Sequence, residues 1–69
     1  MNLYTTKIIE EIRTTDKKEI IVAQSKLTKL EKEVITKVAK DNKKTIAFVT
    51  MNKFLEYKNN NYPNVLVIE

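Results

Sequence analysis

Residues 19–50 read EIIVAQSKLTKLEKEVITKVAKDNKKTIAFVT, and the hydrophobic period changes twice within this stretch. The first run, residues 19–23, is β-branched and continuously apolar after its first residue, which is typical of a strand covered on both faces. Residues 25–40 follow the helical period of about 3.6. Residues 45–50 return to a β-prone run. The pattern predicts a central strand, an amphipathic helix and a second strand.

The helix predicted over residues 25–40 has marked ends. Ser25 is a candidate N-cap, and Thr28 and Glu31 have the spacing of a capping box. Asn42 follows the helix and is expected to adopt the left-handed conformation that ends it. The apolar stripe expected to face the sheet consists of Leu27, Leu30, Val34, Ile35 and Val38.

Two further helices and a third strand are predicted on either side of this unit. Helical spacing of apolar residues occurs in residues 2–13 and 51–57, an Asn-rich loop with Pro63 in residues 58–64, and a strand-like run in residues 65–68. The order helix-strand-helix-strand-helix-strand predicts an α/β fold with a small three-stranded, mainly parallel sheet flanked by three helices. We expect residues 1–69 to form a single α/β domain.

The length of the chain limits its stability. A domain of 69 residues buries only about 60% of the surface that its unfolded chain exposes. There is no Cys and no His, and therefore neither disulfides nor the usual zinc ligands reinforce the core. Self-association is a remaining source of stability, and we expect a homodimer. No cofactor and no metal site is expected.

Groups suited to catalysis are sparse. The close acidic pairs are Glu10 with Glu11 and Glu31 with Glu33, and such near neighbours on a helix point in different directions. Without His, a Ser or Thr nucleophile lacks its usual activating base. We therefore predict that the protein is not an enzyme.

The apolar runs are much shorter than the roughly 20 residues that a membrane-spanning helix needs. The first residues mix apolar with charged side chains and lack the apolar core of a secretory signal. We expect no membrane contact and a cytoplasmic location, which the absence of cysteine supports.

The formal net charge is +4, and Arg13 is the one arginine among 13 basic residues. Lysine, asparagine and isoleucine are frequent and glycine is absent, and this composition is typical of AT-rich genes. Short AT-rich genes occur in bacteriophages, plasmids, archaeal viruses and low-GC bacteria. We therefore expect an accessory protein of a phage, a virus or a mobile element.

One candidate site is an anion or nucleotide site where the strands end. The carboxyl ends of parallel strands share one rim of the sheet, and the polar residues expected there are Ser25, Lys26, Thr50 and Lys53. No glycine-rich phosphate loop is present, because the chain has no glycine. The alternative interpretation is that these residues are helix caps beside solvated lysines.

A second candidate site is a nucleic-acid-binding face on the long helix, because clustered lysines bind phosphate backbones. Its residues are Lys26, Lys29, Lys37, Lys40, Lys43 and Lys44. Glutamates share the helix and arginine is scarce, and any such binding is expected to be weakly sequence-selective. The alternative interpretation is an ordinary solvated face.

The leading prediction is a small non-enzymatic protein-interaction or regulatory module. Phe54, Tyr57 and Tyr62 belong to an aromatic and Asn-rich stretch, a mixture that protein-binding surfaces favour. The alternative is that Phe54 is a core residue next to an ordinary loop. If the strand at residues 65–68 lies at an edge of the sheet, its backbone can pair with a protein partner or with a second copy.

Overall fold

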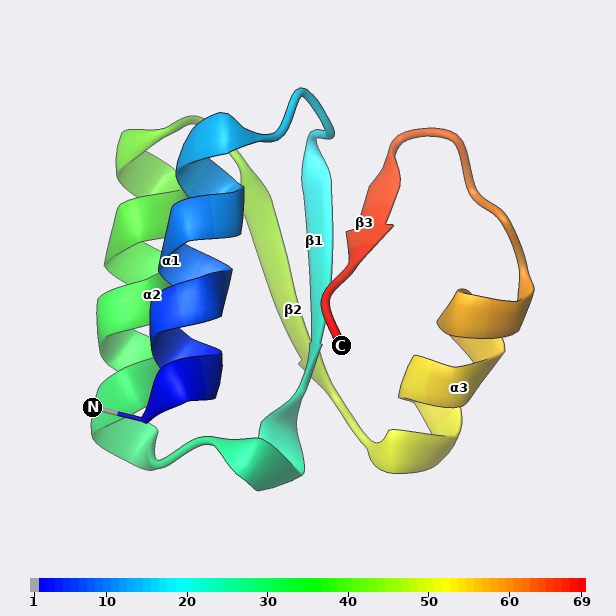
Figure 1. The fold of residues 1–69 in the computed structure, drawn as a ribbon, viewed down its shortest axis with the longest axis horizontal. Coiled ribbons are helices and arrows are strands. Elements are labelled where there is room, and N and C mark those ends of the chain that lie inside the picture. Colours follow the sequence, from blue (N-terminus) through cyan, green and yellow to red (C-terminus); the bar gives the residue numbers. More distant parts are fainter. Residues whose placement is uncertain (1) are drawn as a thin grey trace.

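The computed structural model describes residues 2–69 and confirms the predicted order of elements. In chain order they are α1 (Leu3–Thr14), β1 (Glu19–Ala23), a 3-10 turn (Gln24–Lys26), α2 (Lys29–Asp41), β2 (Thr45–Val49), α3 (Met51–Asn59) and β3 (Val65–Val67). The three strands form one parallel sheet in the order β2-β1-β3. The fold is a small α/β arrangement of three layers (Figure 1).

The central strand is β1, as its continuous apolar run predicts. Ile20 lies opposite Ile46 of β2 and Leu66 of β3, and all four residues from Ile20 to Ala23 are buried. Only a strand with a neighbour on each side and helices on both faces buries consecutive side chains in this way. It follows that β2 and β3 are the two edges of the sheet.

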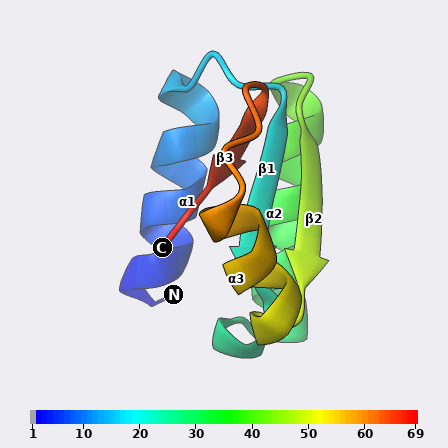
Figure 2. The same cartoon turned by 90° about the vertical axis from the view of Figure 1, so that its right-hand side faces the viewer.

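The two faces of the sheet are covered unequally. Helices α1 and α2 lie on one face and α3 lies on the other (Figures 1 and 2). Because side chains alternate along a strand, Ile20 and Val22 join the larger core beneath α1 and α2. Ile21 and Ala23 pack beneath α3 with one further buried residue, Phe54. The core under α3 is therefore the thinner of the two.

The long helix begins later than predicted, and the assignment of Ser25 as its N-cap is wrong. Ser25 lies in the 3-10 turn, and Leu27 is extended and 9% exposed. The capping box is confirmed, because the Thr28 hydroxyl accepts from Glu31 N at 3.2 Å and the Glu31 carboxylate accepts from Thr28 N at 2.9 Å. The helix starts where both ends of this box are satisfied.

The buried line of α2 also differs from the predicted stripe. Glu31, Ile35 and Ala39 are its buried residues, whereas Leu30 is 69% exposed. Positions i, i+4 and i+8 lie on one side of a helix, and this line is rotated relative to the predicted one. Leu30 was therefore placed wrongly in the core.

The end of α2 is confirmed in position but not in detail. Asn42 keeps a negative φ of −100°, and its side-chain amide donates to Val38 O at 2.8 Å. Lys43 takes the left-handed conformation instead, with φ 58°. Lys43 N donates to Lys40 O and Lys44 N donates to Ala39 O, which is the Schellman pattern.

No helix between residues 2 and 69 is long and apolar enough to span a bilayer.

Candidate functional site

A hollow of about 240 Å³ lies beside the edge strand β3. Val65, Leu66 and Val67 all line it, although side chains of neighbouring strand residues point to opposite faces. The hollow therefore adjoins the backbone edge of the strand. The other lining residues come from the end of α3, the loop that follows it and the chain terminus: Tyr57, Lys58, Asn60, Asn61, Tyr62 and Glu69.

Tyr57 and Tyr62 form an aromatic pair at this hollow. Their ring centroids lie 5.6 Å apart with an interplanar angle of 60°, within the range of favourable tilted pairs. The Lys53 ammonium lies 5.7 Å from the centroid of Tyr57. Tyr62 is 47% exposed and Tyr57 is half-buried. Two of the three predicted protein-binding residues thus lie together beside β3.

The third, Phe54, has a different place. It is 5% exposed and packs with Ile21 and Ala23 in the core beneath α3. Phe54 is the buried residue of α3, and its ring packs on the sheet beside the half-buried Tyr57. The core interpretation holds for this residue.

An ion pair lies beside β3. Lys58 Nζ lies 2.7 Å from the Glu69 carboxylate. The hydrogen bond and charge of Lys58 lower the pKa of Glu69 below its ordinary value, and the more distant Lys7 and Lys26 act in the same direction. The Lys58–Glu69 pair therefore adds no net charge at the end of β3, while Lys17, whose Nζ donates to Pro63 O at 2.6 Å, lies near the start of the strand.

The predicted lysine face does not form one continuous surface. Lys44 Nζ donates to Thr15 O at 2.6 Å and is half-buried, and Lys26 lies over the ring of Tyr4 at 5.0 Å. Lys29 and Lys40, with Lys32 between them, share one side of α2 by helical spacing. We call Lys29, Lys32 and Lys40 the lysine stripe. Lys32 was missed, although its spacing of three from Lys29 and eight from Lys40 is visible in the sequence.

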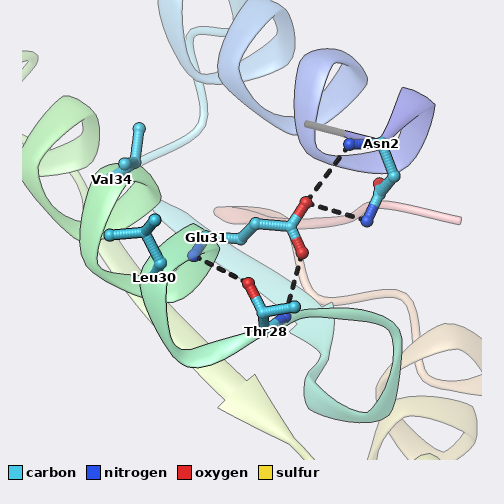
Figure 3. Close-up of a pocket in the computed structure, with 5 residues that line it drawn as sticks. All are labelled: Asn2, Thr28, Leu30, Glu31 and Val34. Carbon is cyan, nitrogen blue, oxygen red and sulfur yellow. Dashed lines mark hydrogen bonds between the residues drawn. The ribbon is translucent and has the colours of Figure 1, made fainter.

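The direction in which the lysine stripe points can be deduced from the contacts on the opposite side of α2. Leu30 and Val34 line a hollow of about 470 Å³ with Asn2, and Glu31 reaches α1 (Figure 3). That side of α2 therefore faces α1. The lysine stripe lies away from α1, toward the free edge of β2, since α2 packs over β2 while α1 lies on the β3 side (Figure 2).

The predicted anion site has its groups at the expected rim, because the 3-10 turn and the start of α3 both follow strand ends (Figure 1). Thr50 is the N-cap of α3 and accepts from Lys53 N at 3.4 Å. Lys53 Nζ lies 3.6 Å from the Glu56 carboxylate. Thr50 and Lys53 thus have partners within α3, and the capping interpretation accounts for Thr50. In the part of the chain that is described, residues 2–69, no group of three or more His, Cys, Asp or Glu is placed to hold a metal.

Glu31 is a highly connected polar group, and of its contacts the sequence predicts only those with Thr28. Its Oε2 accepts from Thr5 Oγ1 at 2.7 Å. The same oxygen accepts from Asn2 Nδ2 at 2.9 Å, and Oε1 accepts from Thr28 N (Figure 3). The hydrogen bonds from Thr28, Thr5 and Asn2, in that order, lower the pKa of Glu31 to about 2. Asn2 is also the N-cap of α1. Glu31 therefore joins the starts of two helices, which is a structural role.

No family model, no curated protein and no solved structure matches this chain.

Proposed function

We propose that the protein is a small non-enzymatic interaction module that forms a homodimer through β3, in the manner of a regulatory or accessory protein of a phage, virus or mobile element. The observation that carries the proposal is the hollow at the β3 edge, with Tyr57 and Tyr62 beside the strand. Aromatic side chains next to an apolar edge are typical of protein contacts.

The backbone of β3 supports pairing with a second copy. Asn64 O and Ile68 N bond to β1, and alternation therefore directs Val65 and Val67 to the outer side. In an antiparallel pair centred on Leu66, the Val67 N–H of each copy meets the Val65 C=O of the other. A symmetric interface requires such self-complementarity, and the paired charges of Lys58 and Glu69 avoid repulsion across the axis.

The thin core beneath α3 supports the same proposal. Among residues 2–69, its buried members are Ile21, Ala23 and Phe54, while Val65 and Val67 are partly buried against them. A chain of this length gains stability from any further apolar burial. Pairing through β3 adds such burial on the weaker side of the sheet.

The test is size-exclusion chromatography with light scattering at low and high salt. We expect twice the mass of one chain at both salt concentrations, because apolar and backbone contacts are insensitive to screening. Tyr62→Ala should give a monomer. Leu3→Ala is the matched control, because Leu3 is 88% exposed on α1 and its loss should leave the dimer intact.

A second candidate function is nucleic-acid binding, which the lysine stripe supports. The same chromatography with added DNA separates the two, since binding through phosphates weakens steeply as salt rises. A chain that is monomeric at every concentration and co-elutes with DNA only at low salt would replace the dimer proposal.

A further inference from the structure

The second edge of the sheet, β2, has few of the features that normally protect an edge. It is five residues long and has no charge and no proline. None of its residues is fully buried: Ile46, Ala47, Phe48 and Val49 are partly buried against the two cores. Natural edges are usually short, charged, bulged or covered. Within residues 2–69 no strand pairs with the outer side of β2 (Figure 2).

The outward backbone groups of β2 can be identified. Thr45 N donates to Lys18 O at 2.9 Å, next to β1. Since the direction of the backbone groups alternates along a strand, Thr45, Ala47 and Val49 face β1. Ile46 and Phe48 therefore present both N–H and C=O to the outside. A peptide strand matches this alternation of donors and acceptors, whereas a phosphate backbone offers acceptors only.

The lysine stripe determines the kind of strand that this edge accepts. Lys29, Lys32 and Lys40 lie on the side of α2 next to the edge, and none of them has an acidic partner among the ion pairs of residues 2–69. The exposed Glu33, four positions after Lys29, shares this side by helical spacing, so that three lysines and one glutamate leave an excess of positive charge there. A second copy paired through β2 would bring its own stripe against this one, which is repulsive. A strand with acidic side chains on the α2 face is attracted instead.

We propose that the β2 edge binds an extended acidic segment of another protein by strand addition, with Ile46 and Phe48 making the backbone hydrogen bonds and the lysine stripe contacting the acidic side chains. The proposal is independent of the homodimer, because β2 and β3 lie at opposite edges of the sheet. A dimer through β3 leaves both β2 edges free.

The experiment measures amide hydrogen exchange by NMR on the full chain with a synthetic peptide of alternating Glu and Val, blocked at both ends. We expect exchange of the Ile46 and Phe48 amides to slow by about tenfold or more at saturation, as for newly bonded strand amides. The Ala47 amide, which faces β1 already, should not change. Binding should weaken as salt rises.

Two control peptides separate backbone pairing from charge. The same sequence with Lys in place of Glu should not bind, and the Glu peptide with N-methyl groups on alternate residues should lose the protection of Ile46 and Phe48. Equal protection of the Ile46 and Phe48 amides by the Lys peptide would overturn the proposal that the partner segment is acidic. Absence of protection with the Glu peptide at millimolar concentration would overturn strand addition.

Protein variants provide the remaining controls. Lys29→Glu should weaken peptide binding by about threefold or more, an effect in the range of reversed exposed ion pairs. Lys7→Glu makes the same change of charge on α1 and should not weaken it. Tyr62→Ala should still bind, so that loss of the dimer and loss of this site are distinguishable. Displacement of the peptide by a short DNA duplex, with Ile46 and Phe48 unprotected, would assign the stripe to nucleic acid instead.

Discussion

At the scale of single residues, Glu31 is the group whose ionisation should matter most for stability. Its folded pKa of about 2 lies below the ordinary value of 4.5, because Thr28, Thr5 and Asn2 donate hydrogen bonds to the carboxylate. Between these values the unfolded chain binds more protons than the folded chain. The stabilisation is therefore complete above about pH 5 and is lost as pH falls through about 2.

Glu31→Gln should lower the melting temperature by several degrees at neutral pH and flatten its dependence on pH between about 5 and 2. Thermal unfolding followed by circular dichroism at several pH values measures both effects. Glu33→Gln, on the exposed side of the same helix, is the matched control and should keep the slope of the wild type. Equal slopes for the wild type and Glu31→Gln would show that another group controls acid unfolding.

The sequence predicts only the local half of this cluster. Thr28 and Glu31 are three positions apart, and a capping box depends on that spacing alone. Asn2 and Thr5 lie 29 and 26 positions from Glu31, and their contacts exist only because α1 packs beside α2. For the same reason Tyr57 and Tyr62, which are close in sequence, were recognised as a surface while their position beside β3 was not.

At the scale of elements, the same carboxylate lies on the side of α2 that faces the core. Its hydrogen bonds draw Glu31 into the junction with α1, and Ile35 and Ala39 follow on the same side of the helix. Leu30 is thereby turned outward. The predicted stripe also counted Leu27 as helical, whereas Leu27 enters the core from extended backbone. Periodicity identifies the helix, whereas its rotation depends on tertiary contacts, both the hydrogen bonds of Glu31 and the burial of Ile35 and Ala39.

A pair of substitutions tests this orientation. Ile35→Val removes one methylene from a fully buried side chain and should cost about 0.5–1.5 kcal/mol of unfolding free energy. Leu30→Ala removes three carbons from an exposed side chain and should change it by no more than about 0.5 kcal/mol. Urea denaturation gives both values. A larger loss of unfolding free energy in Leu30→Ala than in Ile35→Val would show instead that the stripe expected from periodicity is the buried one.

At the scale of the whole molecule, the fold class was predictable because each segment carries its own period, and β1 was recognisable as central from its unbroken apolar run. The strand order and the distribution of charge were not, since both depend on where the crossovers place β2 and β3. The two edges also differ in charge: Lys58 and Glu69 are paired beside β3, whereas the lysine stripe lies beside β2. Composition alone cannot distinguish these two edges.

The two ends of the chain are joined by one side chain, Tyr4 of α1. Its hydroxyl donates to Ile68 O at 2.6 Å and accepts from Ala23 N at 3.3 Å, and burial raises its pKa above the ordinary value. The hydroxyl thus continues the pairing of β1 with the last strand beyond the point where β3 ends at Val67. This hydrogen bond joins residues that are 64 positions apart, and no local sequence pattern predicts it.

Tyr4→Phe should therefore cost about 0.5–1.5 kcal/mol of unfolding free energy, the usual contribution of such a hydrogen bond. The loss of stability should also be visible locally. The Ile68 amide donates to Ile21 O, and it should exchange faster because the Tyr4 hydroxyl no longer holds the residue after β3. Tyr62→Phe removes a hydroxyl from a half-exposed ring and is the matched control. Unchanged exchange at Ile68 in Tyr4→Phe would mean that packing of Ile68 in the core, rather than the hydroxyl, retains the C-terminal strand.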